Sequence, residues 1–343
     1  METALKEYFT ERFASPVEIG KLFRMSGGAC QDNFWLDLKV KQGDFAGEHE
    51  LVLRTDKAAS IESSLTRRQE FRVAALAHQA GALTPNPRWF EANQDILGHP
   101  FYCMERIQGN ADARYIVKDR GLKNTRAQVL GDLAANLARI HSVKREDHAD
   151  FEFLDTGSDM TAENYTNRIT TRLRNMLREL NATAPAAEMV LNWLDEQDAR
   201  PEEFVLVHGD FRTGNYMVDE SGLRGIVDWE FAHWGDGHED LAWFCMRDWR
   251  FGKLRLGAGG IGERTALYEA YGRASGRPVD PARVTFWEIV GNIKWAIGAR
   301  RQSARHLSGK DKGIELASIG RRACEMEYEA MRLIEEFEGN REG

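Results

Sequence analysis

The stretch Phe204-Val-Leu-Val-His-Gly-Asp-Phe-Arg-Thr-Gly-Asn215 constrains the fold more than any other part of the chain. Phe204 to Val207 is a short apolar run, which is typical of a buried strand. A His-Gly-Asp corner follows that strand and places Asp210 directly after it. Asn215 lies five residues further along the chain. The strand is therefore expected to deliver a carboxylate and, shortly afterwards, an amide.

A hairpin is predicted next. Tyr216 to Val218 is a second short strand, an Asp-Glu-Ser-Gly turn follows, and Gly225 to Val227 returns as a third strand. The residue after this third strand is Asp228. We therefore expect the hairpin to bring Asp210, Asn215 and Asp228 near one another.

This set of side chains suggests metal-assisted phosphoryl transfer. Two carboxylates and one amide oxygen are hard ligands, which suit Mg²⁺ better than Zn²⁺. Phosphoryl transfer needs one carboxylate to accept a hydroxyl proton and other oxygens to hold the metal on the phosphates. The Asp-x-x-x-x-Asn spacing, with a further Asp after a hairpin, matches a kinase catalytic loop and its metal-binding aspartate. The alternative is that Asp210, Asn215 and Asp228 are only turn and cap residues.

Three blocks of the sequence are similar to those of the aminoglycoside-phosphotransferase and choline-kinase-like family, which is related to the protein kinases. The blocks are His208-Gly-Asp-x-x-x-x-Asn215, Val227-Asp-Trp-Glu230 and Gly235-Asp-x-x-x-Asp-Leu-Ala242, in this order. The resemblance covers nearly the whole chain and looks closest to the branch that is also found fused to acyl-CoA dehydrogenases. It implies an α+β, two-lobed protein-kinase-like fold, with a small antiparallel-sheet N-lobe and a mostly helical C-lobe.

The resemblance also implies a role for each matching residue. Asp210 would be the catalytic base that takes the proton of the acceptor. Asn215 and Asp228 would bind Mg²⁺. Arg212 lies two residues after Asp210, where protein kinases carry a lysine, and would stabilise charge on the transferred phosphoryl group.

Other polar residues near the corner have two interpretations. His208 is expected to support the corner by hydrogen bonds rather than to act in catalysis. Asp236 and Glu239 have the spacing of a capping box for a helix through Leu241 to Trp249. For Asp236 and Asp240, a capping role and a direct role in the site are both open.

Nine tryptophans are a high number for this length, and four of them lie in the predicted late helices. Aromatic residues at helical spacing usually belong to the core. If several face the cleft instead, the acceptor would be partly apolar. The four residues are Trp243, Trp249, Trp287 and Trp295.

Near the N-terminus, two strands are predicted on either side of a glycine turn. The strands cover Val17 to Met25 and Asn33 to Val40, and the turn contains Gly27 and Gly28. The missing side chains would let backbone N–H groups approach a nucleotide phosphate. A Gly-Gly pair by itself predicts an ordinary hairpin turn. The resemblance favours a phosphate-covering loop.

A cation is predicted at the end of the third strand, Glu50 to Arg54. Kinases carry a lysine there that binds the nucleotide phosphates, and Arg54 can take this role because its guanidinium is always charged and forks onto phosphate oxygens. A helix from Ser63 or Ser64 to Gln79 carries Glu70 on its inward stripe. The resemblance implies that Glu70 pairs with Arg54, and the alternative is a surface pair with Arg67.

The strand that ends in Phe101-Tyr-Cys-Met-Glu-Arg106 falls where the hinge of the family lies. Backbone groups around Met104 to Arg106 would contact the adenine ring, and the plain alternative is a strand that crosses to a second lobe. We place the domain boundary here. Residues 1–106 would form a nucleotide-binding lobe, and residues 107–343 a helical lobe with the catalytic loop and the acceptor site. The last helix is expected over Gly313 to Phe337.

Composition excludes several other classes of protein. The net charge is −8 and no basic run is present, which argues against nucleic acid as a partner. No stretch is apolar for long enough to span a bilayer, and the first residues lack an apolar signal-peptide core. Four cysteines lie far apart, which is typical of reduced thiols in a cytoplasmic protein. A homodimer is compatible with the sequence.

The sequence therefore predicts a kinase that uses ATP and Mg²⁺ to phosphorylate a hydroxyl of a small molecule. The branch that it resembles favours a hydroxy acid or a hydroxyacyl compound over an aminoglycoside. The alternative is a nucleotide-binding module without turnover. Protein kinase activity is disfavoured because Asp-Phe-Gly and Ala-Pro-Glu are absent, and a hydrolase metal pair at His208 and Asp210 lacks companion ligands.

Overall fold

The structure is a computed structural model that describes residues 1–25, 31–56, 64–118, 122, 125–157, 159–309 and 313–339. The chain divides into two compact units. The first unit contains Met1–Ala111 and Asn215–Ala232, and the second contains Asp112–Gly214 and His233–Gly343. The two lobes expected from the sequence, residues 1–106 and 107–343, remain a prediction.

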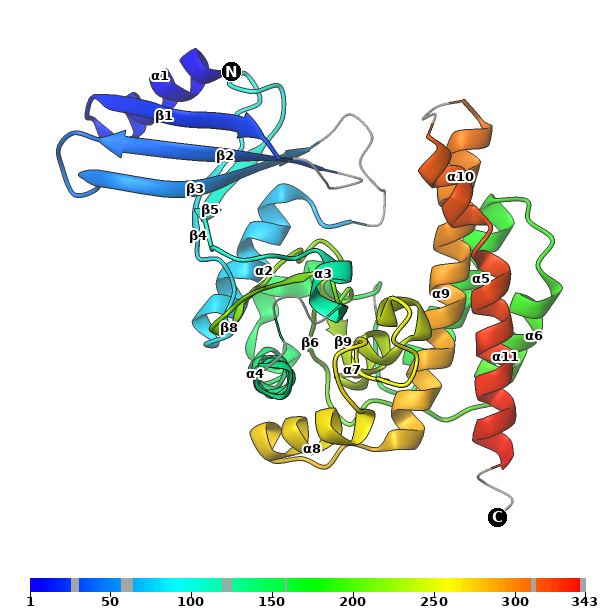
Figure 1. Ribbon diagram of the computed structural model, residues 1–343. Helices are drawn as coiled ribbons and strands as arrows, with labels where there is room; N and C mark the ends of the chain where they lie inside the picture. The colour runs from blue at the N-terminus through cyan, green and yellow to red at the C-terminus, as the bar shows by residue number, and fades with distance from the viewer. Residues whose placement is uncertain are drawn as a thin grey trace. The chain divides into compact units, whose positions relative to one another are not determined.

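The first unit is built on a five-stranded sheet with the order β1-β2-β3-β5-β4. All neighbouring strands are antiparallel, so the predicted antiparallel sheet is confirmed. Figure 1 shows helix α1, Glu2–Phe13, running along β1. Leu5 and Phe9 of α1 are buried in the core of the sheet together with Leu36, Leu38, Leu51 and Leu53. The strands are β1 (Val17–Arg24), β2 (Gln31–Val40), β3 (Gly47–Asp56), β4 (Pro87–Glu91) and β5 (Phe101–Glu105).

Helix α2, Arg67–Gln79, begins later than predicted. Its N-cap is Thr66 rather than Ser63 or Ser64. The Thr66 hydroxyl accepts from the amide of Gln69, and the Gln69 side chain accepts from the amide of Thr66 at 3.0 Å. This reciprocal pair satisfies two amides that the first helical turn leaves without partners, so it sets the start of the helix.

The predicted hairpin is confirmed as β7, Tyr216–Asp219, and β8, Gly222–Ile226. The hairpin packs on the segment that follows α2. Ile226 donates its amide to the carbonyl of Leu83 at 2.8 Å, and its own carbonyl accepts from the hydroxyl of Thr84 at 2.9 Å. Gly225 permits this approach, because a Cβ there would lie 2.6 Å from Cδ1 of Ile107.

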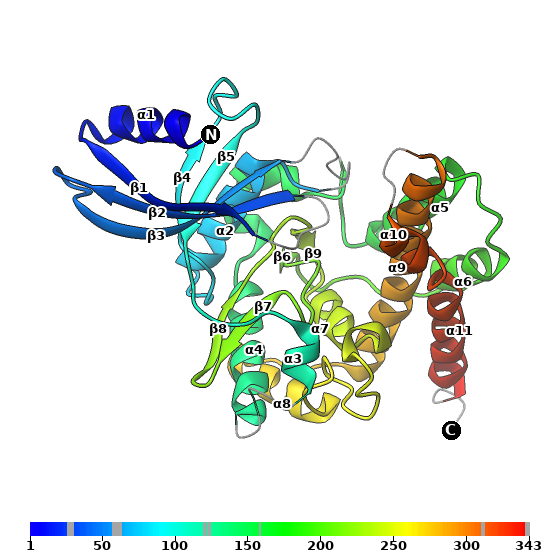
Figure 2. The same ribbon diagram turned by 45° about the horizontal axis from the view of Figure 1, so that its top comes forward.

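The second unit is mostly helical, as predicted. Its two short strands, β6 (Val205–Val207) and β9 (His233–Gly235), pair with each other. Figures 1 and 2 both show α10 and α11 beside the long helix α9. None of the helices in the described ranges is long and apolar enough to cross a bilayer. The helices are α3 (Ala113–Val117), α4 (Arg126–Ile140), α5 (Tyr165–Glu179), α6 (Pro185–Asp195), α7 (His238–Cys245), α8 (Arg264–Ser275), α9 (Pro281–Leu307), α10 (Ile314–Gly320) and α11 (Ala323–Gly339).

The single last helix predicted over Gly313 to Phe337 is wrong, because the structure has α10 and α11 in its place. The break follows Gly320, where a Cβ would collide with Ser303 of α9. The amides of Arg321 and Arg322 bond to carbonyls only three residues earlier, so the helix tightens into a turn there. Close packing of a glycine on α9 therefore divides a segment whose sequence pattern is continuous.

The helix predicted through Trp249 also ends earlier. Helix α7 stops at Cys245, and a separate 3-10 turn covers Arg247–Arg250. The guanidinium of Arg250 donates to the Cys245 carbonyl from Nε at 3.1 Å and from Nη2 at 2.6 Å. A helix leaves its last carbonyls without amide partners, and Arg250 satisfies one of them. The chain can therefore turn at this point.

Candidate active site

The corner after β6 is held by a carboxylate from α7. Asp240 accepts from the amide of His208 at 2.7 Å and from the amide of Gly209 at 2.9 Å. Gly209 has a φ of +78°, which an L side chain rarely adopts. Burial alone would raise the pKa of Asp240, but hydrogen bonds from His141 and from the His208 amide lower it. Asp240 therefore stays charged and positions the corner instead of capping the helix.

Asp210 lies at this corner, and the side chains of Trp243 and Arg212 both donate to its carboxylate. The indole N–H of Trp243 donates to Oδ1 at 2.8 Å. Arg212 donates from Nε to Oδ1 at 3.0 Å and to Oδ2 at 3.2 Å. The Arg212 guanidinium in turn lies 4.7 Å from the ring centroid of Trp249. The structure thus brings together Asp210 and Arg212, the two residues predicted to be catalytic.

Sequence reasoning missed the role of Trp243. Its position relative to Asp240 carries the signal, because residues three apart lie on the same face of a helix. One face of α7 therefore contacts both the amides before Asp210 and the carboxylate of Asp210. His208 acts as expected, since its Nδ1 accepts from the amide of Asp210 at 3.3 Å.

The segment after Asp210 is held by a second loop. The hydroxyl of Thr213 donates to the carbonyl of Gly259 at 2.7 Å. Gly259 donates its amide to Phe244 at 3.0 Å and has a φ of +57°. A Cβ on Gly259 would collide with the Phe244 ring. The loop therefore needs glycine here to reach both α7 and the corner.

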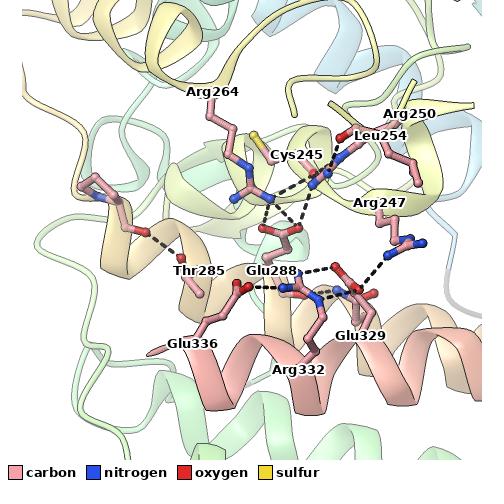
Figure 3. Close-up of polar contacts among 12 residues, drawn as sticks. Cys245, Arg247, Arg250, Leu254, Arg264, Thr285, Glu288, Glu329, Arg332 and Glu336 are labelled. Carbon is pink, nitrogen blue, oxygen red and sulfur yellow. Dashed lines mark hydrogen bonds and ion pairs between the residues drawn. The ribbon is translucent and has the colours of Figure 1, made fainter. Parts of the chain in front are cut away.

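A buried ion-pair cluster connects α7, the following loop, α8 and α9 (Figure 3). The Glu288 carboxylate is fully buried and lies 2.7 Å from Nη2 of Arg264 and 3.6 Å from Nη2 of Arg250. Both arginines also donate to the carbonyl of Cys245, where α7 ends. Burial raises the pKa of Glu288, and the two arginines oppose that rise. The cluster therefore anchors the end of α7 two residues after Trp243.

Asp236 joins the start of α7 to α9. It accepts from the indole N–H of Trp287 at 2.8 Å, from Nδ1 of His238 at 2.9 Å and from the guanidinium of Arg283. Burial alone would raise the pKa of Asp236, but the hydrogen bond from His238 and the charge of Arg283 lower it to about 2. Half of the predicted capping box is present, since the Asp236 amide donates to the Glu239 carboxylate at 2.9 Å. The N-cap itself is Gly237, which has no capping side chain.

A pocket in the second unit opens beside the corner. Two of the four highlighted tryptophans, Trp243 and Trp287, line it. Trp249 and Trp295 pack in one cluster with Met246 and Trp243, and the ring centroids of Trp249 and Trp295 lie 5.2 Å apart. Trp243, Trp249 and Trp287 are buried, as predicted for core residues, and Trp243 and Trp287 also line the pocket. The other lining residues include Gly209, His233, Glu239 and Lys294.

Within the first unit, Arg54 is paired as the resemblance implied. Its Nη2 lies 2.9 Å from Oε1 of Glu70 and also contacts the carboxylate of Asp228. Burial alone would lower the pKa of Arg54, but the charge of Asp228 raises it. Glu70 contacts Arg67 as well, and Arg67 is buried rather than at the surface. Both pairings considered from the sequence are therefore present in one buried network.

Asn215 and Asp228 lie next to each other across the hairpin, because the amide of Val227 donates to the Asn215 carbonyl at 2.9 Å. Asp228 has a φ of +76°, an uncommon conformation for a residue other than glycine. The described residues contain no group of three His, Cys, Asp or Glu side chains suited to a metal. One carboxylate and one amide oxygen are nevertheless the donors that suit Mg²⁺, which keeps several waters and takes phosphate oxygens.

The other predicted nucleotide contacts lie in or directly after β5, or outside the described residues. Arg106 extends from the end of β5 back to Asp37 and Glu50, at 2.6 Å from each, and its amide donates to the Glu50 carbonyl. The Arg106 side chain therefore ties β2 and β3 together. Met104 lies in β5 opposite Val52. Gly27 and Gly28 fall outside the residues that the structure describes.

Comparison with known proteins places these features in a family. The sequence model of the phosphotransferase enzyme family matches residues 24–287. Acyl-CoA dehydrogenase family member 10 of Mus musculus is 28% identical over 254 residues, which are 72% of this chain and 22% of that protein. This chain therefore matches only about a fifth of the length of that curated relative.

Solved structures share the fold. A putative aminoglycoside phosphotransferase from Ralstonia eutropha JMP134 has a TM-score of 0.73 and 19% identity over 98% of both chains. A thermostable mutant of aminoglycoside phosphotransferase APH(4)-Ia, in a ternary complex with AMP-PNP and hygromycin B, has a TM-score of 0.60 and 16% identity over 96% of this chain and 98% of that chain. The predicted two-lobed, kinase-like α+β fold is thus confirmed. Since the family model matches most of the chain, this protein belongs to the phosphotransferase enzyme family.

Proposed function

We propose that this protein is a Mg²⁺-dependent small-molecule kinase that transfers the γ-phosphoryl group of ATP to a hydroxyl group. The observation that carries the proposal is the orientation of the Asp210 carboxylate by Trp243 and Arg212, at a corner positioned by Asp240. A carboxylate held in this way can accept the proton of an alcohol as the alcohol attacks phosphorus. Gly209 and Trp243 at this corner also line the small pocket beside it.

Arg212 has a second part in this proposal. Its guanidinium is held between Asp210 and the Trp249 ring. A permanent charge at a defined position can stabilise the negative charge on the transferred phosphoryl oxygens without reorganising. Asp210 would therefore accept the proton of the alcohol, and Arg212 would stabilise the negative charge of the transferred phosphoryl group.

The nucleotide side of the proposal rests on the first unit. Arg54, supported by Glu70, would bind the ATP phosphates, and Asn215 with Asp228 would hold Mg²⁺. When bound, Mg²⁺ would neutralise the phosphate charge that otherwise opposes attack. Asp210 and Asn215 are only five residues apart, a span of at most about 18 Å even when fully extended. Gly27, Gly28 and the backbone of Met104 to Arg106 are proposed to contact the nucleotide on the family resemblance alone.

The proposed acceptor is a hydroxy acid or a hydroxyacyl compound. Two observations support this class over a polycationic sugar. Trp243, Trp287 and Val290 contribute apolar surface to the pocket, which suits an alkyl chain. The curated relative named above is an acyl-CoA dehydrogenase family member, so its name points toward acyl compounds.

The test is ADP release from Mg-ATP in the presence of a panel of hydroxylated compounds, with wild type beside Asp210→Asn. The panel contains hydroxy acids, hydroxyacyl thioesters, choline, sugars and aminoglycosides. We expect acceptor-dependent release that falls by about 10²–10⁴-fold in the variant, the usual contribution of a general base. Asp198→Asn, an exposed aspartate paired with Arg200, serves as the matched control and should keep full activity.

Two outcomes would contradict the proposal. ATP binding without ADP release for any acceptor would favour a nucleotide-binding module without turnover. Absence of ATP binding by the wild-type protein would exclude both functions.

A further inference from the structure

Lys294 of α9 is the lysine among the residues that line the pocket. Trp287, Gly291 and Lys294 are spaced by four and three residues, so they lie on one face of α9. All three line the pocket with Gly209 and Trp243. Gly291 lets α9 approach α7 closely, because a Cβ there would lie 3.2 Å from Cε3 of Trp243 and 2.9 Å from the sulfur of Met246.

The ammonium group of Lys294 is linked to the corner through Trp243. Its Nζ lies 5.3 Å from the centroid of the Trp243 ring, a distance typical of a cation–π contact. The N–H of the same ring donates to Asp210. Burial lowers the pKa of Lys294, the charge of Glu239 opposes that change, and the charge of Arg172 adds to it. Asp210 is also near enough for its charge to act on Lys294.

The carboxylates around the pocket already have their own partners. Glu239 accepts from the Tyr165 hydroxyl at 2.5 Å and from the Asp236 amide at 2.9 Å through Oε1, and its Oε2 lies 3.2 Å from Nε2 of His233. Asp240 is bound by the amides of the corner. Each of these carboxylates is thus satisfied without Lys294.

Lys294 itself has neither a hydrogen bond nor an ion pair with any other residue in the described part of the chain. A half-buried ammonium that loses water without gaining a carboxylate partner is unfavourable. Such a group is stabilised when a ligand supplies the missing negative charge. Because Lys294 lines the pocket beside the corner, an incoming anion is the matching partner for its charge.

We propose that Lys294 binds a free carboxylate of the acceptor while a hydroxyl of the same molecule faces Asp210. The inference rests on the proposed kinase function and narrows its substrate to a hydroxycarboxylate. The indole rings of Trp243 and Trp287 would contact the carbon chain between the two polar groups. The same ammonium would repel cationic acceptors such as quaternary amines and polyamino sugars.

The test compares Lys294→Met with Lys294→Arg in the full chain. Each isomer of hydroxybutyrate and hydroxyhexanoate is assayed beside its neutral amide and its thioester. In Lys294→Met we expect KM for the free acids to rise by about 10–100-fold, the usual effect of losing a hydrogen bond to a charged group. The neutral amides should show unchanged kinetics, and Lys294→Arg should restore most of the preference for acids. Lys6→Met, an exposed lysine on α1, is the control for the substitution.

A purely structural role for Lys294 gives a different pattern. If the ammonium only holds the Trp243 ring in position, Lys294→Met lowers kcat for acids and amides alike. The ratio of KM for the free acid to KM for the amide then stays unchanged. That result overturns the inference. A wild-type preference for thioesters, amides or cationic acceptors over free acids also overturns it.

Direct binding separates this inference from the proposed function. Titration calorimetry with the same hydroxycarboxylates requires no turnover. Binding that is lost in Lys294→Met, in a protein that releases no ADP, would retain the anion site and reject the kinase. ADP release that depends on Asp210 but not on Lys294 would retain the kinase and reject the anion site.

Discussion

The indole N–H of Trp243 donates a hydrogen bond of 2.8 Å to Oδ1 of Asp210. This bond joins the body of α7 to the carboxylate that would act as the base. A neutral donor on a rigid ring fixes the direction of the carboxylate without giving it a proton. The guanidinium of Arg212 donates to the same carboxylate and places a positive charge beside it. Orientation and electrostatics at Asp210 therefore come from two different side chains.

Trp243→Phe should separate these two contributions. The ring remains in place, but the donor to Asp210 is removed. We expect kcat to fall by about 10–100-fold, because a hydrogen bond to a charged group is lost while the carboxylate stays. The measurement is steady-state ADP release at saturating ATP. Trp295→Phe, which removes a 2.8 Å bond to Asp248 instead, is the matched control and should leave kcat nearly unchanged. Equal losses in both variants would contradict a specific role for Trp243.

Arg54→Lys should show whether ATP binding requires the two-pronged donor geometry of the Arg54 guanidinium. Lysine keeps the charge but can no longer donate to Glu70 and Asp228 in the geometry of Arg54. We expect KM for ATP to rise by about tenfold, with a smaller change in KM for the acceptor. Arg88→Lys, at an exposed pair with Glu105, provides the comparison and should not change KM for ATP. An unchanged KM for ATP in Arg54→Lys would argue against a phosphate-binding role.

Glu288→Gln should destabilise the second unit. The substitution leaves the guanidinium groups of Arg264 and Arg250 without their buried carboxylate. We expect the free energy of unfolding to fall by about 3–5 kcal/mol, as for other buried pairs that lose one partner. Chemical denaturation followed by tryptophan fluorescence measures this change. Glu269→Gln breaks an exposed pair with Arg273 and should produce a change below about 1 kcal/mol.

Acid should weaken the fold through Asp236. Its pKa in the folded protein is about 2, below the ordinary value of 3.8, so the unfolded chain takes up the proton first as the pH falls. The stabilisation is fully present above about pH 5 and is lost between about pH 4 and 2. The difference corresponds to roughly 2 kcal/mol. Denaturation curves at several pH values should show this loss, and the acid-dependent part should be smaller in Asp236→Asn. A variant with the same pH profile as wild type would contradict the assignment.

Short-range patterns predicted much of the fold correctly. The segments on either side of Gly27 and Gly28 were predicted as strands and correspond to β1 and β2, and the apolar run from Phe204 to Val207 contains β6. The turn signal at Asp219 to Gly222 predicted the β7–β8 hairpin. These features depend on neighbours in sequence, so local physics is sufficient to predict them.

Errors occurred where packing overrides a local pattern. The segment from Gly313 to Phe337 has a helical pattern throughout, but contact with Ser303 of α9 favours a break at Gly320. Similarly, Arg250 turns back onto the Cys245 carbonyl and ends α7 before Trp249. Neither contact is visible in the sequence, because each partner comes from another turn or another helix.

The sequence by itself determined the family, the strand–corner–hairpin order and the identity of the residues proposed for phosphoryl transfer. Only the tertiary structure decided how they are held. Asp240 is 32 and 31 residues away from the amides it binds at His208 and Gly209. Lys294 meets Trp243 only because Gly291 lets α9 pack against α7. Spacing in sequence reports which side chains are available, whereas their hydrogen bonds and charges meet only when separate helices pack at van der Waals distance.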